Sequence, residues 1–214
     1  MTASELIAGG DFLRAFTDSG QNPNETNTPM RIANPPLSGV EGIALRQIEA
    51  TDCEAWYGYL RLPEVFERTS WNLRSADDLR GTLEGCLTDG AGSQMRMAVV
   101  DESTSRLVGT IGLHTISEVN RSAELAYDLS PTHWGRGLAT RLCDAVTSWS
   151  FQTLNIHRLQ ATVLIGNQRS ERVLGRCGFR REGLLRGFRM VRGRPGDFNM
   201  FARLSTDETR SNKG

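Results

Sequence analysis

The fold is decided by one stretch, Glu124-Leu-Ala-Tyr-Asp-Leu-Ser-Pro-Thr-His-Trp-Gly-Arg-Gly-Leu-Ala-Thr140. It reads as a strand, a short loop and a glycine-rich entry into an amphipathic helix that continues to about Phe151. Gly135 and Gly137 carry no Cβ atoms that would keep an anion away from the backbone. The first N–H groups of a helix have no intrahelical partner and attract negative charge. The stretch therefore predicts a backbone anion site suited to a diphosphate-bearing cofactor.

The remaining elements alternate between strand and helix patterns around this unit. Strands are predicted at 43–48, 95–101, 107–116, 123–129, 159–165, 182–191 and 197–204, and helices at 51–62, 75–87 and 168–176. A turn is predicted at Gly193-Arg194-Pro195-Gly196. The expected fold class is α/β, a mixed sheet with helices on its faces.

The chain divides into one domain with two appendages. Residues 41–206 carry the regular pattern, and residues 207–214 form a short tail. Residues 1–40 are rich in Asn, Thr, Pro and Gly, with one short helix predicted at Glu5–Phe16. We expect this N-terminal extension to be flexible or docked on the domain surface.

Composition indicates a soluble globular protein. The 25 basic and 25 acidic residues cancel, which does not favour nucleic acid as a direct partner. No apolar run reaches membrane-spanning length and no signal peptide is evident, so a cytoplasmic location is expected. The four cysteines are dispersed without metal-ligand spacing, which predicts reduced thiols and no metal site. Arginines cluster between Arg169 and Arg194, where they favour an anion-attracting surface.

Four motifs appear in order along the chain. They are Ala-Glu-Leu-Ala-Tyr-Asp-Leu-Ser-Pro at 123–131, Trp-Gly-Arg-Gly-Leu-Ala at 134–139, Asn167-x-x-Ser170, and Cys-Gly-Phe at 177–179 followed by Glu182-Gly183. With these motifs, residues 43 to about 204 resemble the GNAT superfamily of acyl-CoA-dependent N-acetyltransferases, closest to its RimJ/RimL-like branch. The second motif is similar to the superfamily's pyrophosphate motif, with Trp134 in place of a Gln or Arg.

The resemblance implies a GNAT-type fold, a central mixed six- to seven-stranded sheet flanked by helices. In such a fold the strand at 127–129 splays from the strand at 159–165, and the notch receives the pantetheine arm of acetyl-CoA. No metal is implied. The implied cofactor-binding residues are Tyr127, Asp128, Leu129, Trp134, Gly135, Arg136, Gly137, Leu138, Ala139, Thr140, Asn167 and Ser170.

Three residues are candidates for catalysis, each with an alternative role. Ser170 is placed to protonate the leaving thiolate, or it only bonds the helix cap at Asn167. Asn167 is in turn either a cofactor ligand or a plain helix cap. Glu124 is a candidate general base or a solvent-facing strand residue. Glu182 is a second candidate base or the partner of a nearby arginine. His114, His133 and His157 are scattered and match no catalytic triad.

The implied acceptor is a primary amine. An α-amine of pKa about 8 is roughly 10% neutral at pH 7, whereas a lysine is below about 0.1% neutral. A poorly defined base therefore favours a protein N-terminus, ribosomal or other, over an ordinary lysine. A small-molecule or antibiotic amine and a catalytically silent acyl-CoA-binding domain stay open as alternatives, as do a monomer and a homodimer. A Rossmann dinucleotide site is disfavoured because Thr140 replaces its third glycine.

Overall fold

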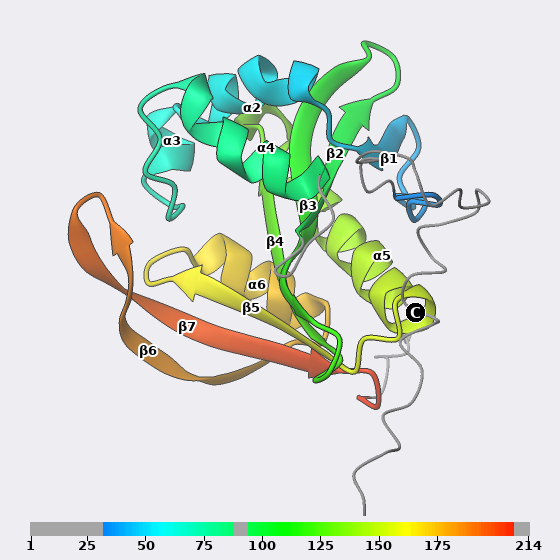
Figure 1. Cartoon of the computed structure of the whole chain (residues 1–214), viewed down its shortest axis with the longest axis vertical. Coiled ribbons are helices and arrows are strands. Elements are labelled where there is room, and N and C mark those ends of the chain that lie inside the picture. The colour runs from blue at the N-terminus through cyan, green and yellow to red at the C-terminus, as the bar shows by residue number, and fades with distance from the viewer. Residues whose placement is uncertain (1–31, 88–93, 208–214) are drawn as a thin grey trace, which may run out of the picture.

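The computed structural model describes residues 32–87 and 94–207 and contains one seven-stranded sheet (Figure 1). Its strands, in spatial order, are β1 (Ile43–Gln47), β2 (Met95–Asp101), β3 (Arg106–Ser117), β4 (Ser122–Leu129), β5 (Arg158–Leu164), β7 (Arg194–Leu204) and β6 (Arg180–Val191). Neighbouring strands are antiparallel except β4 and β5, which are parallel. The predicted mixed sheet is confirmed.

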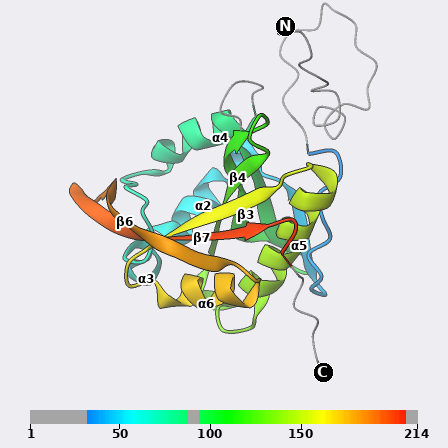
Figure 2. The same ribbon diagram turned by 90° about the horizontal axis from the view of Figure 1, so that it is seen from below.

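Helices cover both faces of the sheet (Figures 1 and 2). They are α2 (Cys53–Leu60), α3 (Pro63–Phe66), α4 (Arg80–Leu87), α5 (Leu138–Thr153) and α6 (Gln168–Arg176), with 3₁₀ turns η1 (Ala50–Asp52), η2 (Ala76–Leu79) and η3 (Pro131–His133). The larger core cluster joins α5 and α6 to one face of the sheet. A second cluster is built from α2, α3 and α4.

The alternation of side chains along β4 decides which residues face which layer. Leu125 and Leu129 are buried in the core cluster shared with α5 and α6. Asp128 projects to the opposite face, where it accepts a hydrogen bond from Trp56 of α2. Successive strand residues point to opposite faces, so Glu124 lies on the same face as Asp128.

The parallel pair β4–β5 opens after three residues. Its register joins Ser122–Glu124 to Arg158–Gln160 and goes no further. Beyond that point β4 stays paired with β3, and β5 stays paired with β7. The predicted splay between these strands is therefore confirmed, and it leaves a notch between the two halves of the sheet.

The structure corrects the predicted elements in two places. The β6–β7 turn is the pair Arg192–Gly193, and Pro195 lies inside β7 rather than in the turn. Both turn residues have positive φ, 51° and 76°, as a two-residue hairpin of type I′ requires. Helix α3 was not predicted, although Pro63 at its first position is a common start signal.

Residues 32–40 run alongside β1. The Ile32 side chain is buried in the larger core, and its N–H donates to Gln47 Oε1 at 2.7 Å. The predicted helix Glu5–Phe16 and all of the predicted tail but its first residue lie outside the described residues. Within the described part of the chain, no helix is both long and apolar enough to cross a membrane.

Candidate active site

The glycine-rich loop before α5 forms an open cradle of backbone amides. Gly135 and Gly137 have φ values of 78° and 76°, and Gly137 is the N-cap of α5. A Cβ added at either glycine would meet nothing within 4 Å, so the space above the loop is free for a ligand. Among the described residues, none accepts a hydrogen bond from the N–H groups of 135–139. The Thr140 N–H, which the sequence placed in the anion site, donates to Gly137 O at 3.1 Å instead.

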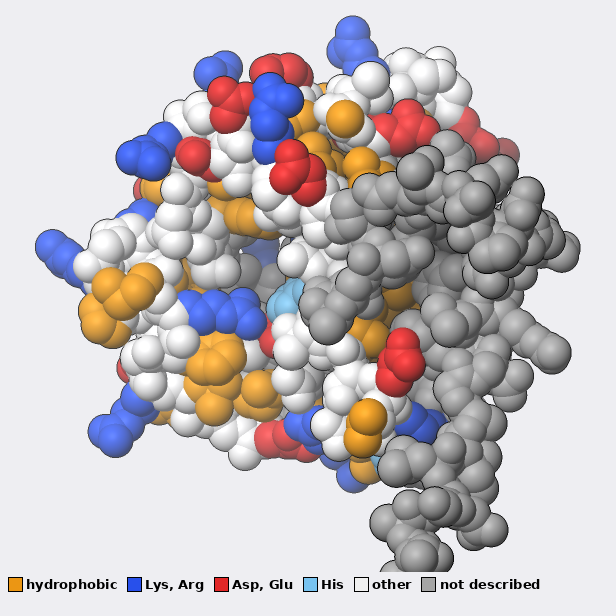
Figure 3. Space-filling view, in the orientation of Figure 1, with side chains coloured by type: hydrophobic (Ala, Val, Ile, Leu, Met, Phe, Trp, Pro, Cys, Tyr) orange, Lys and Arg blue, Asp and Glu red, His pale blue; other side chains and the backbone are white. Residues whose placement is uncertain are grey.

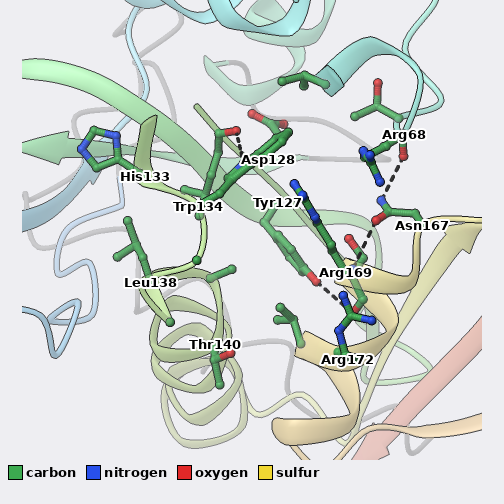
Figure 4. Close-up of a pocket in the computed structure, with 18 of the residues that line it drawn as sticks. Arg68, Tyr127, Asp128, His133, Trp134, Leu138, Thr140, Asn167, Arg169 and Arg172 are labelled. Carbon is green, nitrogen blue, oxygen red and sulfur yellow. Dashed lines mark hydrogen bonds between the residues drawn. The ribbon is translucent and has the colours of Figure 1, made fainter. Parts of the chain in front are cut away.

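A cavity of about 500 Å³, here called the loop cavity, lies between this loop, β4 and α6 (Figure 4). All the predicted cofactor-binding residues line it except Arg136. Four further arginines were not predicted as site residues: Arg68, Arg169, Arg172 and Arg176. Three of these lie on α6 at positions i, i+3 and i+7, a spacing that places them on one face of the helix. This spacing within the predicted arginine cluster is the sequence signal that could have identified the three arginines as site residues.

Asn167 joins the two sides of the notch. Its Oδ1 accepts the Ser170 N–H at 3.2 Å, which confirms its role as the cap of α6. Its Nδ2 donates to the backbone oxygen of Arg68 at 2.9 Å (Figure 4). Both polar atoms of the side chain already have partners, so Asn167 positions α6 against the segment after α3.

Trp134 shapes the wall of the loop cavity. Its Nε1 donates to the Leu129 backbone oxygen at 2.9 Å. The guanidinium of Arg169 lies 4.7 Å from the centre of the indole, which is cation–π geometry. Figure 4 shows Arg169 reaching from α6 towards this ring. The pair therefore holds a positive charge beside the glycine-rich loop.

Ser170 lies where the loop cavity meets a second cavity. Within the described residues, its hydroxyl has no hydrogen-bond partner, and its backbone oxygen accepts from the Tyr127 hydroxyl at 3.4 Å. Burial raises the pKa of the Tyr127 phenol well above its ordinary value, so the phenol stays protonated. Among the described residues at this junction, the Ser170 hydroxyl is thus an unused donor, whereas the Tyr127 hydroxyl already donates to the Ser170 backbone.

The Asp128 carboxylate lies in a buried hydrogen-bond network with residues of α2 and β3. It accepts hydrogen bonds from Trp56 Nε1 and Thr110 Oγ1, both at 3.0 Å, and from the Tyr59 hydroxyl. Arg96 lies 3.7 Å away as an ion-pair partner. Because the Asp128 side chain is bonded to α2 and β3, its backbone rather than its side chain is available to contact a cofactor arm.

The second cavity, here called the His114 cavity, has a volume of about 640 Å³ and opens on the α4 side of the notch. Tyr127, Asp128, Asn167 and Ser170 line both cavities, so the two chambers meet at the splay. Figure 3 shows this face hollowed near its centre, with arginine and histidine side chains at the hollow. The arrangement suits a reaction between two substrates that enter from opposite sides.

Glu124 lies in the wall of the His114 cavity. Its side chain is 5% exposed, so the alternative of a solvent-facing residue is wrong. Its Oε1 accepts from Thr162 Oγ1 at 2.5 Å and from Arg189 at 2.9 Å. His114, which sequence reasoning left without a role, places Nε2 3.8 Å from the same oxygen.

Glu182 does not reach either cavity. It forms an ion pair with Arg158 at 2.6 Å, the alternative that the sequence left open. The hydrogen bonds from Arg158 lower the pKa of this carboxyl, which makes it a weaker base. Its predicted catalytic role therefore has no support in the geometry.

No group of three His, Cys, Asp or Glu side chains in residues 32–87 and 94–207 is placed to hold a metal ion. All four cysteines are free thiols.

The model of the acetyltransferase (GNAT) domain family matches residues 43–180. This chain belongs to the GNAT acetyltransferase family. The match confirms the resemblance drawn from the four motifs, and with it the expected enzyme class, an acyl-CoA-dependent N-acetyltransferase. GNAT acetyltransferases use acetyl-CoA as the acyl donor.

Relatives of this GNAT chain differ in the acceptor that their names state. This chain is 30% identical over 171 residues to YoaA, an uncharacterized N-acetyltransferase of Bacillus subtilis (strain 168), and the match covers 78% of this chain and 96% of the relative. It is 26% identical over 132 residues to the ribosomal-protein-serine acetyltransferase of Escherichia coli (strain K12), covering 62% and 73%. The spermidine N-acetyltransferase of Vibrio cholerae, solved with CoA and spermine, matches with a TM-score of 0.68 and 26% identity, covering 78% and 98%.

Proposed function

We propose that this acetyltransferase binds acetyl-CoA in the loop cavity and transfers its acetyl group to the α-amine of a protein or peptide in the His114 cavity. The observation that carries the acceptor assignment is the charge balance of the His114 cavity. Its described lining contains three arginines, Arg68, Arg96 and Arg189, and two carboxylates, Glu124 and Asp128.

Both carboxylates already have cationic partners. Glu124 pairs with Arg189 at 2.9 Å and Asp128 with Arg96 at 3.7 Å. Among the described lining residues, no carboxylate is left to hold the second or third ammonium of a polyamine. A peptide brings one amine followed by amide groups, and this fits a cavity whose described lining has more arginines than carboxylates better than a polyamine does.

The donor side is supported by the fit of the loop to a diphosphate. The amides of 135–139 and the arginines of α6 supply hydrogen bonds and positive charge, as an anion of this kind requires. When bound, acetyl-CoA supplies an acetyl group activated as a thioester. The backbone of β4 beyond Glu124 is released from β5 and is free to orient an amide-bearing arm.

A panel of acceptors tests the proposal. Thiol release is measured with acetyl-CoA and peptides that begin with Ser or Ala, with the same peptides blocked at the N-terminus, and with spermidine and small amines. We expect the free peptides to show the highest kcat/KM and mass spectrometry to place the acetyl group on the α-amine. A higher kcat/KM for spermidine or another small amine would overturn the acceptor assignment, and no turnover with any amine would favour a silent binding domain.

The Ser170 hydroxyl is proposed to protonate the departing thiolate. Ser170→Ala should then lower kcat while leaving the KM for acetyl-CoA nearly unchanged, because the interaction is made mainly in the transition state. The capping bond uses the Ser170 N–H and survives the substitution. Steady-state kinetics check this, and a change confined to KM would instead assign the hydroxyl to binding.

A further inference from the structure

His114 lies at the end of the regular part of β3, in the wall of the His114 cavity. The β3–β4 register places it directly opposite Glu124. Cross-strand neighbours point to the same face, so both side chains project into this cavity. The His114 side chain is 27% exposed, and its Nε2 lies 3.8 Å from Glu124 Oε1. The imidazole therefore lies within reach of a ligand in the cavity and beside a buried carboxylate.

A strained residue fixes the orientation of the ring. The β3 register shifts between His114 and Ser117, and Thr115 has a φ of 52°. Positive φ is rare for a β-branched residue, and such strain gathers at functional sites. Thr115 Oγ1 lies 3.0 Å from His114 Nδ1. In the tautomer that carries its proton on Nδ1, His114 donates to this hydroxyl, and Nε2 has a lone pair that can accept a proton.

Burial, more than the surrounding charges, favours the unprotonated form of His114. Burial lowers the pKa of His114 below its ordinary value of 6.5, and Arg189 of β6 and Arg96 of β2 lower it further. Glu124 of β4 acts in the opposite direction. From β5 the neighbouring side chain is Thr162, which is uncharged and bonds Glu124. Glu124 Oε1 already accepts hydrogen bonds from Thr162 and Arg189, so this oxygen is less available to a proton from a ligand in the cavity.

We propose that His114 Nε2 takes the proton from the acceptor's ammonium group and that Glu124 is a positioning residue for the resulting imidazolium. The acceptor R–NH₃⁺ gives one proton to Nε2 and becomes R–NH₂. Its nitrogen forms the N–C bond to the acetyl carbon as the C–S bond breaks, and its second proton ends on the departing sulfur. His114 then returns its proton to solvent, so the products are R–NH–acetyl, CoA–SH and H⁺.

This assignment rests on the proposed acceptor cavity but not on which amine occupies it. We expect His114→Gln to lower kcat/KM by at least about 10²-fold at pH 7, the usual contribution of a positioned base. The loss should shrink as the pH approaches the pKa of the amine, because the neutral nucleophile then forms without help. The matched control is His157→Gln, since His157 lies in neither cavity and bonds Ser205 at the surface. We expect that control to retain wild-type activity.

The pH profile separates His114 from Glu124. Wild-type kcat/KM should fall with decreasing pH through a midpoint below 6.5, as the imidazole becomes protonated. In Glu124→Gln the carboxylate no longer raises the pKa of His114, so the midpoint should move to still lower pH, with a smaller loss of rate than in His114→Gln. If the fall in kcat/KM at low pH persists in His114→Gln but disappears in Glu124→Gln, the base is Glu124 and the proposal is overturned.

Proton NMR supplies a readout that needs no acceptor and no acetyl-CoA. The chain has three histidines, so the His114 signal can be assigned by its loss in His114→Gln. We expect it to titrate below 6.5, and lower again in Glu124→Gln. A His114 signal whose titration is unchanged in Glu124→Gln would overturn the proposal, whatever the acceptor panel shows, because the two side chains would then not interact as the proposal requires.

Discussion

Asp128→Ala should lower the free energy of unfolding by about 3 to 5 kcal/mol, the usual cost of removing one partner of a buried ion pair. The substitution leaves Arg96 without its carboxylate, and the hydrogen bonds from Trp56, Tyr59 and Thr110 are lost with it. A domain of this size is stable by about 5 to 15 kcal/mol, so the loss would be a large share of the total. Urea unfolding followed by circular dichroism measures it.

Asp77→Ala is the matched control for this prediction. Asp77 also pairs with an arginine, Arg80 at 2.7 Å, but both side chains are more than 70% exposed. Exposed pairs contribute little, so we expect the unfolding midpoint of this variant to stay near that of the wild type. Equal losses in the two variants would show that the buried network does not stabilise the fold as described.

Gly137→Val should weaken acetyl-CoA binding about 10²-fold. A branched side chain would fill the open space above the loop and separate the diphosphate from the amides. Losing two hydrogen bonds to a charged group at about 1.5 kcal/mol each corresponds to a factor of about 10² in the dissociation constant. Isothermal titration calorimetry, run below the unfolding transition of the variant, measures the change.

The strain that valine introduces at a positive φ needs its own control. Gly193 in the β6–β7 turn has the same φ of 76° and equally open space around its Cβ position. Gly193→Val should therefore lose stability as Gly137→Val does but bind acetyl-CoA like the wild type. If both variants bind acetyl-CoA normally, the loop is not the diphosphate site.

Local sequence signals were enough to predict the elements around the loop cavity. The glycines before α5 need positive φ, and Asn167 and Gly178 bound α6, so the residues of each element specify it. Gly178 and Phe179 close α6 with the two hydrogen bonds of a Schellman motif. The β6–β7 turn was placed wrongly because Pro195 and Gly196 suggest a turn wherever they occur, whereas strand pairing placed it at Arg192 and Gly193.

The lining of the His114 cavity could not be predicted in the same way, because it is built from pairs that are distant along the chain. Whether Glu124 faces solvent or a cavity depends on Arg189, 65 residues away, and on Thr162. The role of His114 depends on the register that sets it opposite Glu124. Register follows from the packing of the whole sheet, and a single strand's sequence does not specify it.

The alternation along β4 has a consequence for how the proposed acceptor site could change while the proposed donor site is kept. Glu124 and Ala126 line the His114 cavity alone, Leu129 and the loop that follows line the loop cavity alone, and Tyr127 lines both. Point substitutions at 124 or 126 can therefore alter the choice of amine while the carrier site stays intact. A one-residue insertion in β4 would instead exchange the two faces, and both substrates would be lost together.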